Sequence, residues 1–210
     1  MILRGGFHAV PDGWLATIVT HLEMTQAPPS APAALPTDVV LYHEDRPATN
    51  WYRDLFNRIG ADWLWTSRLE LAVPDLAVIL SSPDVEVWTL RRGGTDLALC
   101  ELDFRASGAC ELAFFGLDPR LHGRGLSHPL LAHAAARAWA RPIRRFTVHT
   151  CTHDHPAALG LYRRAGFVPV RREVEMMPDP RLSGLLPADA APHVPLIRRA
   201  GAMDAAAARR

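Results

Sequence analysis

Residues 120–125 read RLHGRG, and they precede a segment, residues 126–140, whose alanine and leucine content favours an α-helix. The first turn of a helix leaves about four backbone N–H groups without partners and carries the positive end of the helix dipole, so phosphate oxygens bind there. The two glycines of the hexapeptide lack the Cβ atoms that would keep a phosphate away from the backbone, and the two arginines add positive charge. The hexapeptide therefore predicts a binding loop for a phosphate-bearing ligand.

Two better-known phosphate loops are excluded by the same residues. A P-loop requires a lysine, and the chain contains none. A dinucleotide-binding fingerprint requires three glycines, but Leu126, Ser127 and His128 follow the second glycine here. On this motif alone, an ordinary strand-to-helix turn that uses glycine only for its backbone geometry stays open.

The segments around the loop predict a mixed α/β sheet. Strands are expected at residues 14–25, 85–90, 97–104, 111–117, 146–150 and 167–176, and helices at residues 48–59, 74–80, 126–140 and 155–165. This order has one helical crossover after the fourth strand, which differs from the strict alternation of a doubly wound fold. Most neighbouring strands should therefore be antiparallel.

The chain is expected to form a single domain at residues 14–178, after a flexible N-terminus at residues 1–13. Four prolines within residues 27–37 predict a surface loop, because proline suits neither a helix interior nor a central strand. Residues 179–210 are rich in proline, alanine and arginine, and they are expected to be an extension that is disordered from about Arg198 onward.

The composition of the chain indicates which binding partners and which cellular compartment to expect. A net charge of +1 gives no indication of a nucleic acid or a membrane surface as partner. Three cysteines without close pairing argue against a disulfide framework and are typical of a reducing cytosol. The chain also lacks a secretory signal at its N-terminus and a run of about 20 apolar residues. We therefore expect a cytoplasmic protein with no nucleic-acid or membrane partner.

Two motifs resemble those of the GNAT N-acetyltransferase family. The pattern Arg120-x-x-Gly123-x-Gly125 is similar to the family signature Gln/Arg-x-x-Gly-x-Gly/Ala. Residues 155–167 are similar to the family's second motif, Asn-x-x-Ala-x-x-Leu-Tyr-x-x-x-Gly-Phe, with His155 in the usual place of asparagine. The resemblance covers residues 85–176 well and residues 14–80 only by the order of elements.

The resemblance implies the GNAT fold, with a mostly antiparallel central sheet flanked by helices. In that fold the parallel fourth and fifth strands splay apart, here around Phe115 and Val148, and acetyl-CoA enters the gap as cosubstrate without a metal. Backbone N–H groups freed by the splay would polarise the thioester carbonyl. The cofactor-binding residues that the resemblance implies are Phe115, Gly116, Leu117, Arg120, His122, Gly123, Arg124, Gly125, Leu126, Ser127, His155, Ala158 and Tyr162.

The resemblance further implies direct transfer of an acetyl group to a primary amine in a ternary complex. Tyr162 occupies the family's acid position, but its ordinary pKa of about 10 exceeds the ~8.5 of a thiol, so we expect a hydrogen bond to the thiolate rather than full proton transfer. Glu111 opens the fourth strand, as a catalytic glutamate does in some members, and it is the best candidate base. Glu101 and Asp103 are weaker candidates.

The acceptor side is less determined. Trp63 and Trp65 are expected to line the acceptor pocket, although most aromatic residues of this stretch should be core. The acceptor itself, a small-molecule or peptide amine, and a homodimer stay open. A non-catalytic acyl-CoA-binding sensor is the main alternative to an enzyme, and the presence of an acid together with a base favours catalysis.

A histidine- and cysteine-rich segment raises a third hypothesis, a metal-dependent hydrolase. His149, Cys151 and His153 would project from one face of a continuing strand, and imidazole and thiolate are zinc ligands. Their spacing matches no named zinc motif, and the strand is expected to end near Thr152. We therefore expect no metal site, and we expect instead that these polar groups line the cofactor cleft where strand meets helix.

Overall fold

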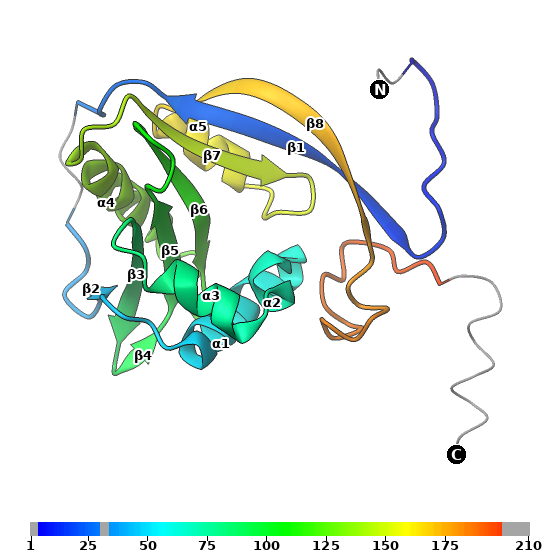
Figure 1. The fold of residues 1–210 in the computed structure, drawn as a ribbon, viewed down its shortest axis with the longest axis horizontal. Helices are drawn as coiled ribbons and strands as arrows, with labels where there is room; N and C mark the ends of the chain where they lie inside the picture. Colours follow the sequence, from blue (N-terminus) through cyan, green and yellow to red (C-terminus); the bar gives the residue numbers. More distant parts are fainter. Residues whose placement is uncertain (1–3, 30–33, 199–210) are drawn as a thin grey trace.

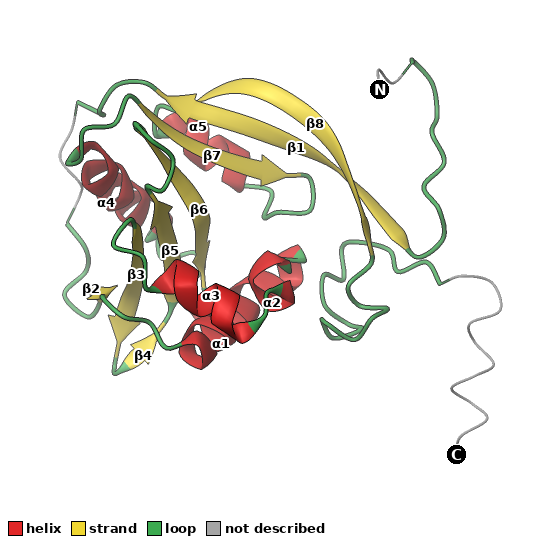
Figure 2. Cartoon of the chain, in the orientation of Figure 1, coloured by secondary structure: helices red, strands yellow, loops and turns green. Residues whose placement is uncertain are grey.

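The computed structural model of the protein describes residues 4–29 and 34–198, and it contains one open mixed sheet with helices on both faces (Figures 1 and 2). The strands are β1 (Trp14–Met24), β2 (Val40–Glu44), β3 (Val85–Arg92), β4 (Thr95–Asp96), β5 (Ala98–Asp103), β6 (Ala109–Leu117), β7 (Arg145–Cys151) and β8 (Val168–Pro178). The helices are α1 (Thr49–Gly60), α2 (Ser67–Glu70), α3 (Val73–Leu80), α4 (Ser127–Trp139) and α5 (Ala158–Arg164).

The strands lie in the order β2–β3–β5–β6–β7–β1–β8, and β4 pairs with β3. Within the described residues, β6 and β7 are parallel and every other strand pair is antiparallel. The expected sheet, mostly antiparallel with one parallel pair after the helical crossover, is therefore confirmed. The first strand lies between β7 and β8, so the N-terminal segment is built into the C-terminal half of the sheet (Figure 1).

Some elements differ from the expected order. The strands β2 and β4 and the single-turn helix α2 are additional, and all three are too short for residue periodicity to reveal them. Helix α5 begins at Ala158 rather than at His155, because the residues around Pro156 form a turn. The other helices and strands lie within a few residues of their predicted bounds.

The parallel strands β6 and β7 pair at only three positions, from Ala109 with Arg145 to Glu111 with Thr147. Strand β6 nevertheless continues to Leu117, and β7 continues to Cys151. The two strands therefore part beyond Glu111, and the expected splay around Phe115 and Val148 is confirmed. This splay positions the candidate site.

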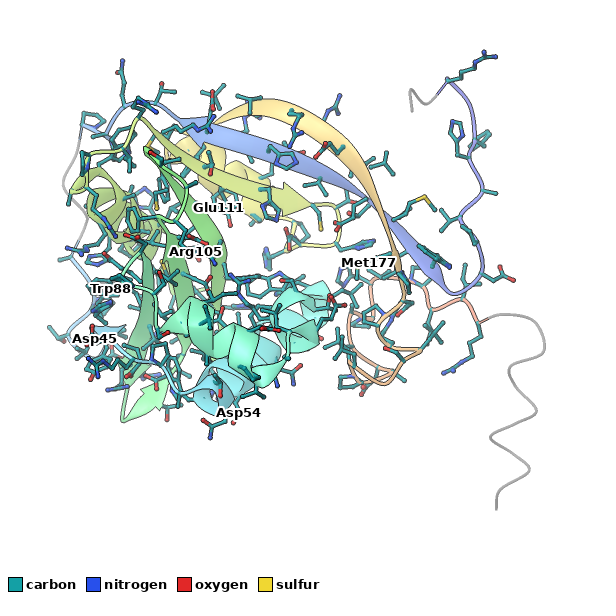
Figure 3. All side chains as sticks on the ribbon, in the orientation of Figure 1. Asp45, Asp54, Trp88, Arg105, Glu111 and Met177 are labelled. Atoms are coloured by element: carbon teal, nitrogen blue, oxygen red, sulfur yellow. The ribbon has the colours of Figure 1, made fainter. Side chains whose placement is uncertain are left out.

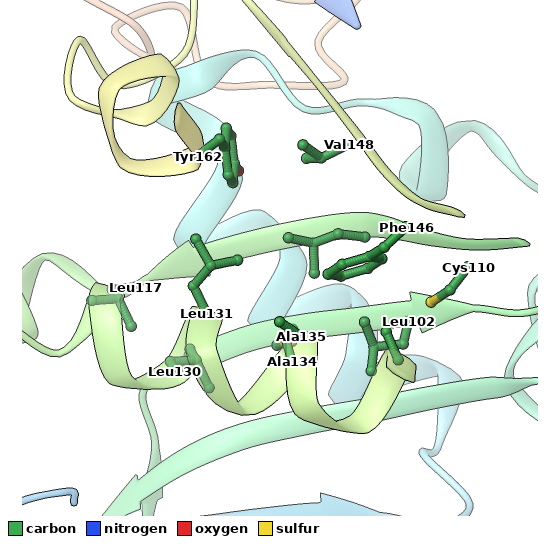
Figure 4. Close-up of a cluster of buried hydrophobic side chains, with 14 of the residues drawn as sticks. Leu102, Cys110, Leu117, Leu130, Leu131, Ala134, Ala135, Phe146, Val148 and Tyr162 are labelled. Carbon is green, nitrogen blue, oxygen red and sulfur yellow. The ribbon is translucent and has the colours of Figure 1, made fainter. Parts of the chain in front are cut away.

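Helices α4 and α5 cover one face of the sheet, which we call the α4 face. On α4, Leu130, Leu131 and Ala134 are fully buried, and they pack with Phe146 of β7 in the larger core cluster (Figure 4). Each fully buried leucine contributes about 1.5–3 kcal/mol of transfer free energy. This packing fixes where α4 begins relative to the splayed strands.

Helix α1 covers the opposite face, which we call the α1 face. Its buried residues Tyr52, Leu55, Phe56 and Ile59 follow the i, i+3, i+4, i+7 spacing of a helix with one apolar side. They pack against β3 and β5 in a second cluster. Helices thus cover both faces of the sheet.

Residues 179–198, which we call the C-terminal lobe, are ordered around a buried arginine. Arg181 is 6% exposed, and its guanidinium donates to the carboxylate of Asp179 and to the carbonyl oxygens of Ala190, Ala191 and Val194. The disorder expected from about Arg198 onward falls almost entirely on residues 199–210, which lie outside the described residues.

Two N-terminal predictions are tested only in part. Residues 4–12 are exposed and carry no helix or strand, and their flexibility stays a prediction. Residues 30–33 of the proline-rich loop lie outside the described residues, and the flanking residues 27–29 and 34–37 have no regular structure. None of the helices within residues 4–29 and 34–198 has the length and apolar character needed to cross a bilayer.

Candidate functional site

A cleft of about 920 Å³ opens where β6 and β7 part, and it reaches both faces of the sheet. On the α4 face its walls are the loop at residues 121–127 and the start of α5. On the α1 face they are residues 63–67, the end of β8 and the C-terminal lobe. Met177 lies where β8 meets that lobe (Figure 3). The cleft is therefore lined by residues from both faces of the sheet.

The glycine loop takes a backbone conformation that favours glycine. Gly123 and Gly125 have φ values of +73° and +71°, and a Cβ atom at either position would meet no atom within 4 Å. The glycines thus serve backbone geometry rather than packing. No described side chain caps the start of α4, and Pro129 has no N–H, so the N–H groups of Ser127 and His128 in the first turn have no intrahelical partner. The loop has the donors that an anion requires.

The two arginines of the loop are engaged elsewhere. The Nε and Nη2 atoms of Arg120 donate to the two carboxylate oxygens of Asp118 at 2.8 Å each, and Nη2 of Arg124 donates to Asp38 at 2.9 Å. Hydrogen bonds from Arg120 lower the pKa of the buried Asp118 to about 2. Neither arginine lines the cleft. Both guanidinium groups are thus paired with carboxylates in this structure, and their contact with a phosphate stays a prediction.

All other predicted cofactor-binding residues line the cleft. These residues are Phe115, Gly116, Leu117, His122, Gly123, Gly125, Leu126, Ser127, His155, Ala158 and Tyr162. The ring of His122 bonds the carbonyl oxygen of Leu117 at 3.1 Å, and the ring of His155 accepts from the N–H of Ala157 at 3.1 Å. Both histidines therefore hold the turns that bracket the cleft.

Tyr162 lies on α5 and faces the splay, with its ring 6.3 Å from that of Phe115 (Figure 4). It is 5% exposed, and burial together with the charge of Asp154 raises the pKa of its phenol well above the usual value. No described residue forms a hydrogen bond with its hydroxyl group. The phenol therefore stays protonated and can donate to a ligand in the cleft.

Glu111 does not line the cleft, but its partner does. Its Oε1 atom lies 3.3 Å from Nδ1 of His149, which is a lining residue on β7. The neighbouring imidazole lowers the pKa of Glu111, and the carboxylate raises the pKa of His149. His149 therefore lies in the cleft, as the alternative to a metal ligand predicts, but nothing in a single sequence indicates that Glu111 faces it across parallel strands.

The weaker base candidates are occupied by structural contacts. Glu101 is fully buried, accepts a hydrogen bond from the hydroxyl of Tyr52, and pairs with Arg68 at 2.6 Å. Asp103 pairs with Arg105 at 2.6 Å. Neither carboxylate lines the cleft.

Trp63 and Trp65 both line the cleft, where the sequence predicts an acceptor pocket. The indole of Trp65 donates to Asp154 at 3.3 Å, and its ring packs 5.4 Å from that of Phe114. A Cβ atom at Gly60 would lie 2.5 Å from the same ring, so the small residue there makes room for the indole. Trp65 thus joins the α1 face of the cleft to the loop after β7.

The α1 face also contains lining residues that the sequence did not reveal. They are Thr17, Val19, Glu70, Glu175, Met177, Asp179, Ser183 and Leu185. They come from β1, α2, β8 and the C-terminal lobe, and only the strand order brings these segments together. Within the part of the chain that the structure describes, no three histidine, cysteine, aspartate or glutamate side chains gather as metal ligands.

Comparisons with known proteins give a family and a fold. The model of the acetyltransferase (GNAT) family matches residues 45–167. A GCN5-related N-acetyltransferase from Sphaerobacter thermophilus is 19% identical with a TM-score of 0.53, over 81% of this chain and 53% of that one. A putative GNAT-family acetyltransferase from Novosphingobium aromaticivorans is also 19% identical with a TM-score of 0.53, over 80% of this chain and 67% of that one.

The chain spans 53% to 63% of the length of the first three solved structures that it matches. At these identities the likeness establishes the fold alone. No curated protein matches the chain.

Proposed function

Because the chain belongs to the acetyltransferase (GNAT) family, we propose that it moves an acetyl group from acetyl-CoA to a primary amine by direct transfer in a ternary complex. The observation that carries this proposal is the cleft at the splay of β6 and β7, which joins an uncapped helix start to a buried phenol. Acetyl-CoA would enter from the α4 face and the amine from the α1 face.

The backbone would provide most of the contacts to acetyl-CoA. Amide groups between Gly123 and His128 suit the diphosphate. The backbone of β6 beyond Glu111 has no partner on β7, so its free N–H groups suit the pantetheine arm and the thioester carbonyl. A well-aligned donor of this kind stabilises a developing oxyanion by about 2.7–4 kcal/mol.

Tyr162 would act on the leaving thiolate. Its raised pKa makes full proton transfer unfavourable and a strong hydrogen bond favourable, because the phenol is neutral and sits in a dry part of the cleft. Cys151 also lines the cleft, but burial raises the pKa of its thiol, which disfavours a covalent acyl-enzyme. Direct transfer is therefore preferred to a two-step route.

The charge of the cleft favours a cationic acceptor. No described arginine lines the cleft, whereas Glu70, Asp154, Glu175 and Asp179 do. Asp154 and Asp179 accept hydrogen bonds from protein donors. Glu70 and Glu175 have no such partner among the described residues, so they would attract an ammonium group and repel a carboxylate.

Incubation with acetyl-CoA and a panel of amines tests the proposal. The panel contains spermidine, tryptamine, lysine methyl ester and, as an anionic comparison, glutamate. Release of free thiol and a mass increase of one acetyl group on a cationic amine are expected. Binding of CoA without turnover on any amine would favour the acyl-CoA sensor instead. All described cysteines are free, which supports a cytoplasmic location, and a homodimer stays a prediction.

A further inference from the structure

We propose that the imidazole of His149 takes the proton that the acceptor ammonium loses, and that Glu111 is its positioning residue. This inference rests on the proposed acetyl transfer. It replaces the simpler hypothesis in which the carboxylate of Glu111 is itself the base.

The place of His149 in the sheet is the first argument. It lies two residues beyond Thr147, the last residue of β7 that pairs with β6, so it sits where the strands begin to part. Phe146 and Val148 are buried toward the α4 face, and side chains alternate along a strand, so His149 faces the α1 face. That is the face from which the amine would arrive.

The second argument is the partner of the imidazole. Nδ1 of His149 lies 3.3 Å from Oε1 of Glu111, and no other described residue forms an ion pair or hydrogen bond with this ring. When Nδ1 carries the proton shared with the carboxylate, the lone pair of Nε2 is available as a base. His149 lines the cleft and Glu111 does not, so only the imidazole is placed to meet an acceptor.

The charged groups around the pair also favour a basic imidazole. The groups that face the imidazole of His149 are Glu111 of β6, Asp154 after β7, Glu175 of β8 and His21 of β1, whose ring lies 5.8 Å away. The charges of Asp103 on β5 and Arg68 on α2 act on the carboxylate of Glu111. The three carboxylates nearest the ring raise the pKa of His149 above the ordinary value. A base with a raised pKa removes a proton from an ammonium group more readily.

The protons balance in two steps. One proton passes from the ammonium to Nε2 and then to water, which leaves a neutral amine. The amine nitrogen then attacks the thioester carbonyl, so a C–N bond forms and the C–S bond breaks. The second proton leaves the nitrogen as the amide forms and ends on the CoA thiol, whose thiolate is stabilised by the hydroxyl of Tyr162.

The test compares H149Q and E111Q with a control histidine-to-glutamine variant, H43Q. His43 lies on the edge strand β2 and does not line the cleft. The readouts are kcat/KM against pH for the fastest amine of the panel, CoA affinity by calorimetry, and the pKa of His149 by NMR of its ring nitrogens. The NMR titration requires no turnover.

H149Q should lower kcat/KM by about 10²–10⁴-fold at neutral pH with CoA affinity unchanged, since a general base contributes a factor of that size. E111Q should lower kcat/KM less, lower the pKa of His149, and move the acid limb of the pH profile to lower pH. H43Q should behave as the wild type. A structural role alone would not move that limb.

Three results would overturn the inference. If H149Q has the kcat/KM of the wild type, His149 is not the base, and the proposed acetyl transfer is unaffected. Greater loss in E111Q than in H149Q would return the role to the carboxylate. A wild-type protein that binds CoA but acetylates no amine would reject both the base and the proposed function together.

Discussion

The two faces of the cleft are built in opposite ways. The α4 face comes from residues 115–127 and 155–162, which lie close together in the sequence, and its loop presents backbone groups placed by two glycines and a helix start. The α1 face is assembled from β1, residues 63–70, β7, β8 and the C-terminal lobe, and its contacts are side chains. The loop on the α4 face is therefore specified by neighbouring residues, whereas the lining of the α1 face depends on how distant segments pack.

The largest expected effect concerns the C-terminal lobe. Arg181→Leu removes the buried partner of Asp179, and breaking a buried ion pair on one side costs about 3–5 kcal/mol. We expect a large loss of the free energy of unfolding in urea. At a temperature where the variant is folded, the acceptor KM should rise while CoA affinity stays within twofold.

Arg105→Leu is the matched control, because Arg105 pairs with Asp103 in the same i, i+2 arrangement but is 44% exposed. It should cost no more than about 1 kcal/mol. If both variants lose the same free energy of unfolding, the buried Arg181–Asp179 pair does not stabilise the C-terminal lobe more than an exposed pair would.

The next effect concerns the glycine loop. Gly125→Ala places a Cβ atom on a left-handed residue, which costs roughly 1–2 kcal/mol although space around it is open. The loop should relax away from this conformation, so CoA affinity should fall about tenfold by calorimetry.

Gly93→Ala provides the comparison, since Gly93 has a φ of +53° in open space within a distant hairpin. It should show a similar stability cost and unchanged CoA affinity. A tenfold loss of CoA affinity in both variants would contradict the local role of the loop.

A smaller effect is expected at the junction of the two faces. Trp65→Phe keeps an aromatic ring in the pocket but removes the hydrogen bond to Asp154. A net loss of about 0.5–1.5 kcal/mol should raise the acceptor KM by roughly two- to tenfold. Steady-state kinetics with the fastest amine would measure it, and a change in CoA affinity instead would place Trp65 on the wrong face.

The smallest effect tests the charges at the loop. Asp38→Asn frees the guanidinium of Arg124 for a phosphate, at a surface site where such pairs contribute about 0–1 kcal/mol. CoA affinity should rise by up to about fivefold, most clearly at low salt. Weaker binding of CoA in this variant would show that the carboxylate supports the loop rather than competes with the ligand.

The same difference between the faces explains what the sequence could predict. The glycines, the helix start and the position of Tyr162 follow from local spacing, and the structure brings them to one cleft. The insertion of β1 between β7 and β8 depends on strand pairing over more than 100 residues, which periodicity does not encode. For the same reason the Glu111–His149 pair and the C-terminal lobe were beyond prediction.

The pairing of the loop arginines with carboxylates could be predicted only in part. Asp118 is two residues before Arg120, so their pairing is local and could have been weighed. Asp38 reaches Arg124 from across the fold, and no local signal indicates it. Charged side chains near a glycine motif are thus weaker evidence for a phosphate site than the backbone geometry of the motif.

The central claim is that CoA binds in the cleft at the splay of β6 and β7, with its diphosphate on the backbone amides at the start of α4. Titration calorimetry of the full chain with CoA and, in parallel, with pantetheine, which lacks the diphosphate, tests it most directly. We predict saturable binding of CoA and at least hundredfold weaker binding of pantetheine. No heat with CoA from folded protein, or equal affinity for the two ligands, would contradict the claim.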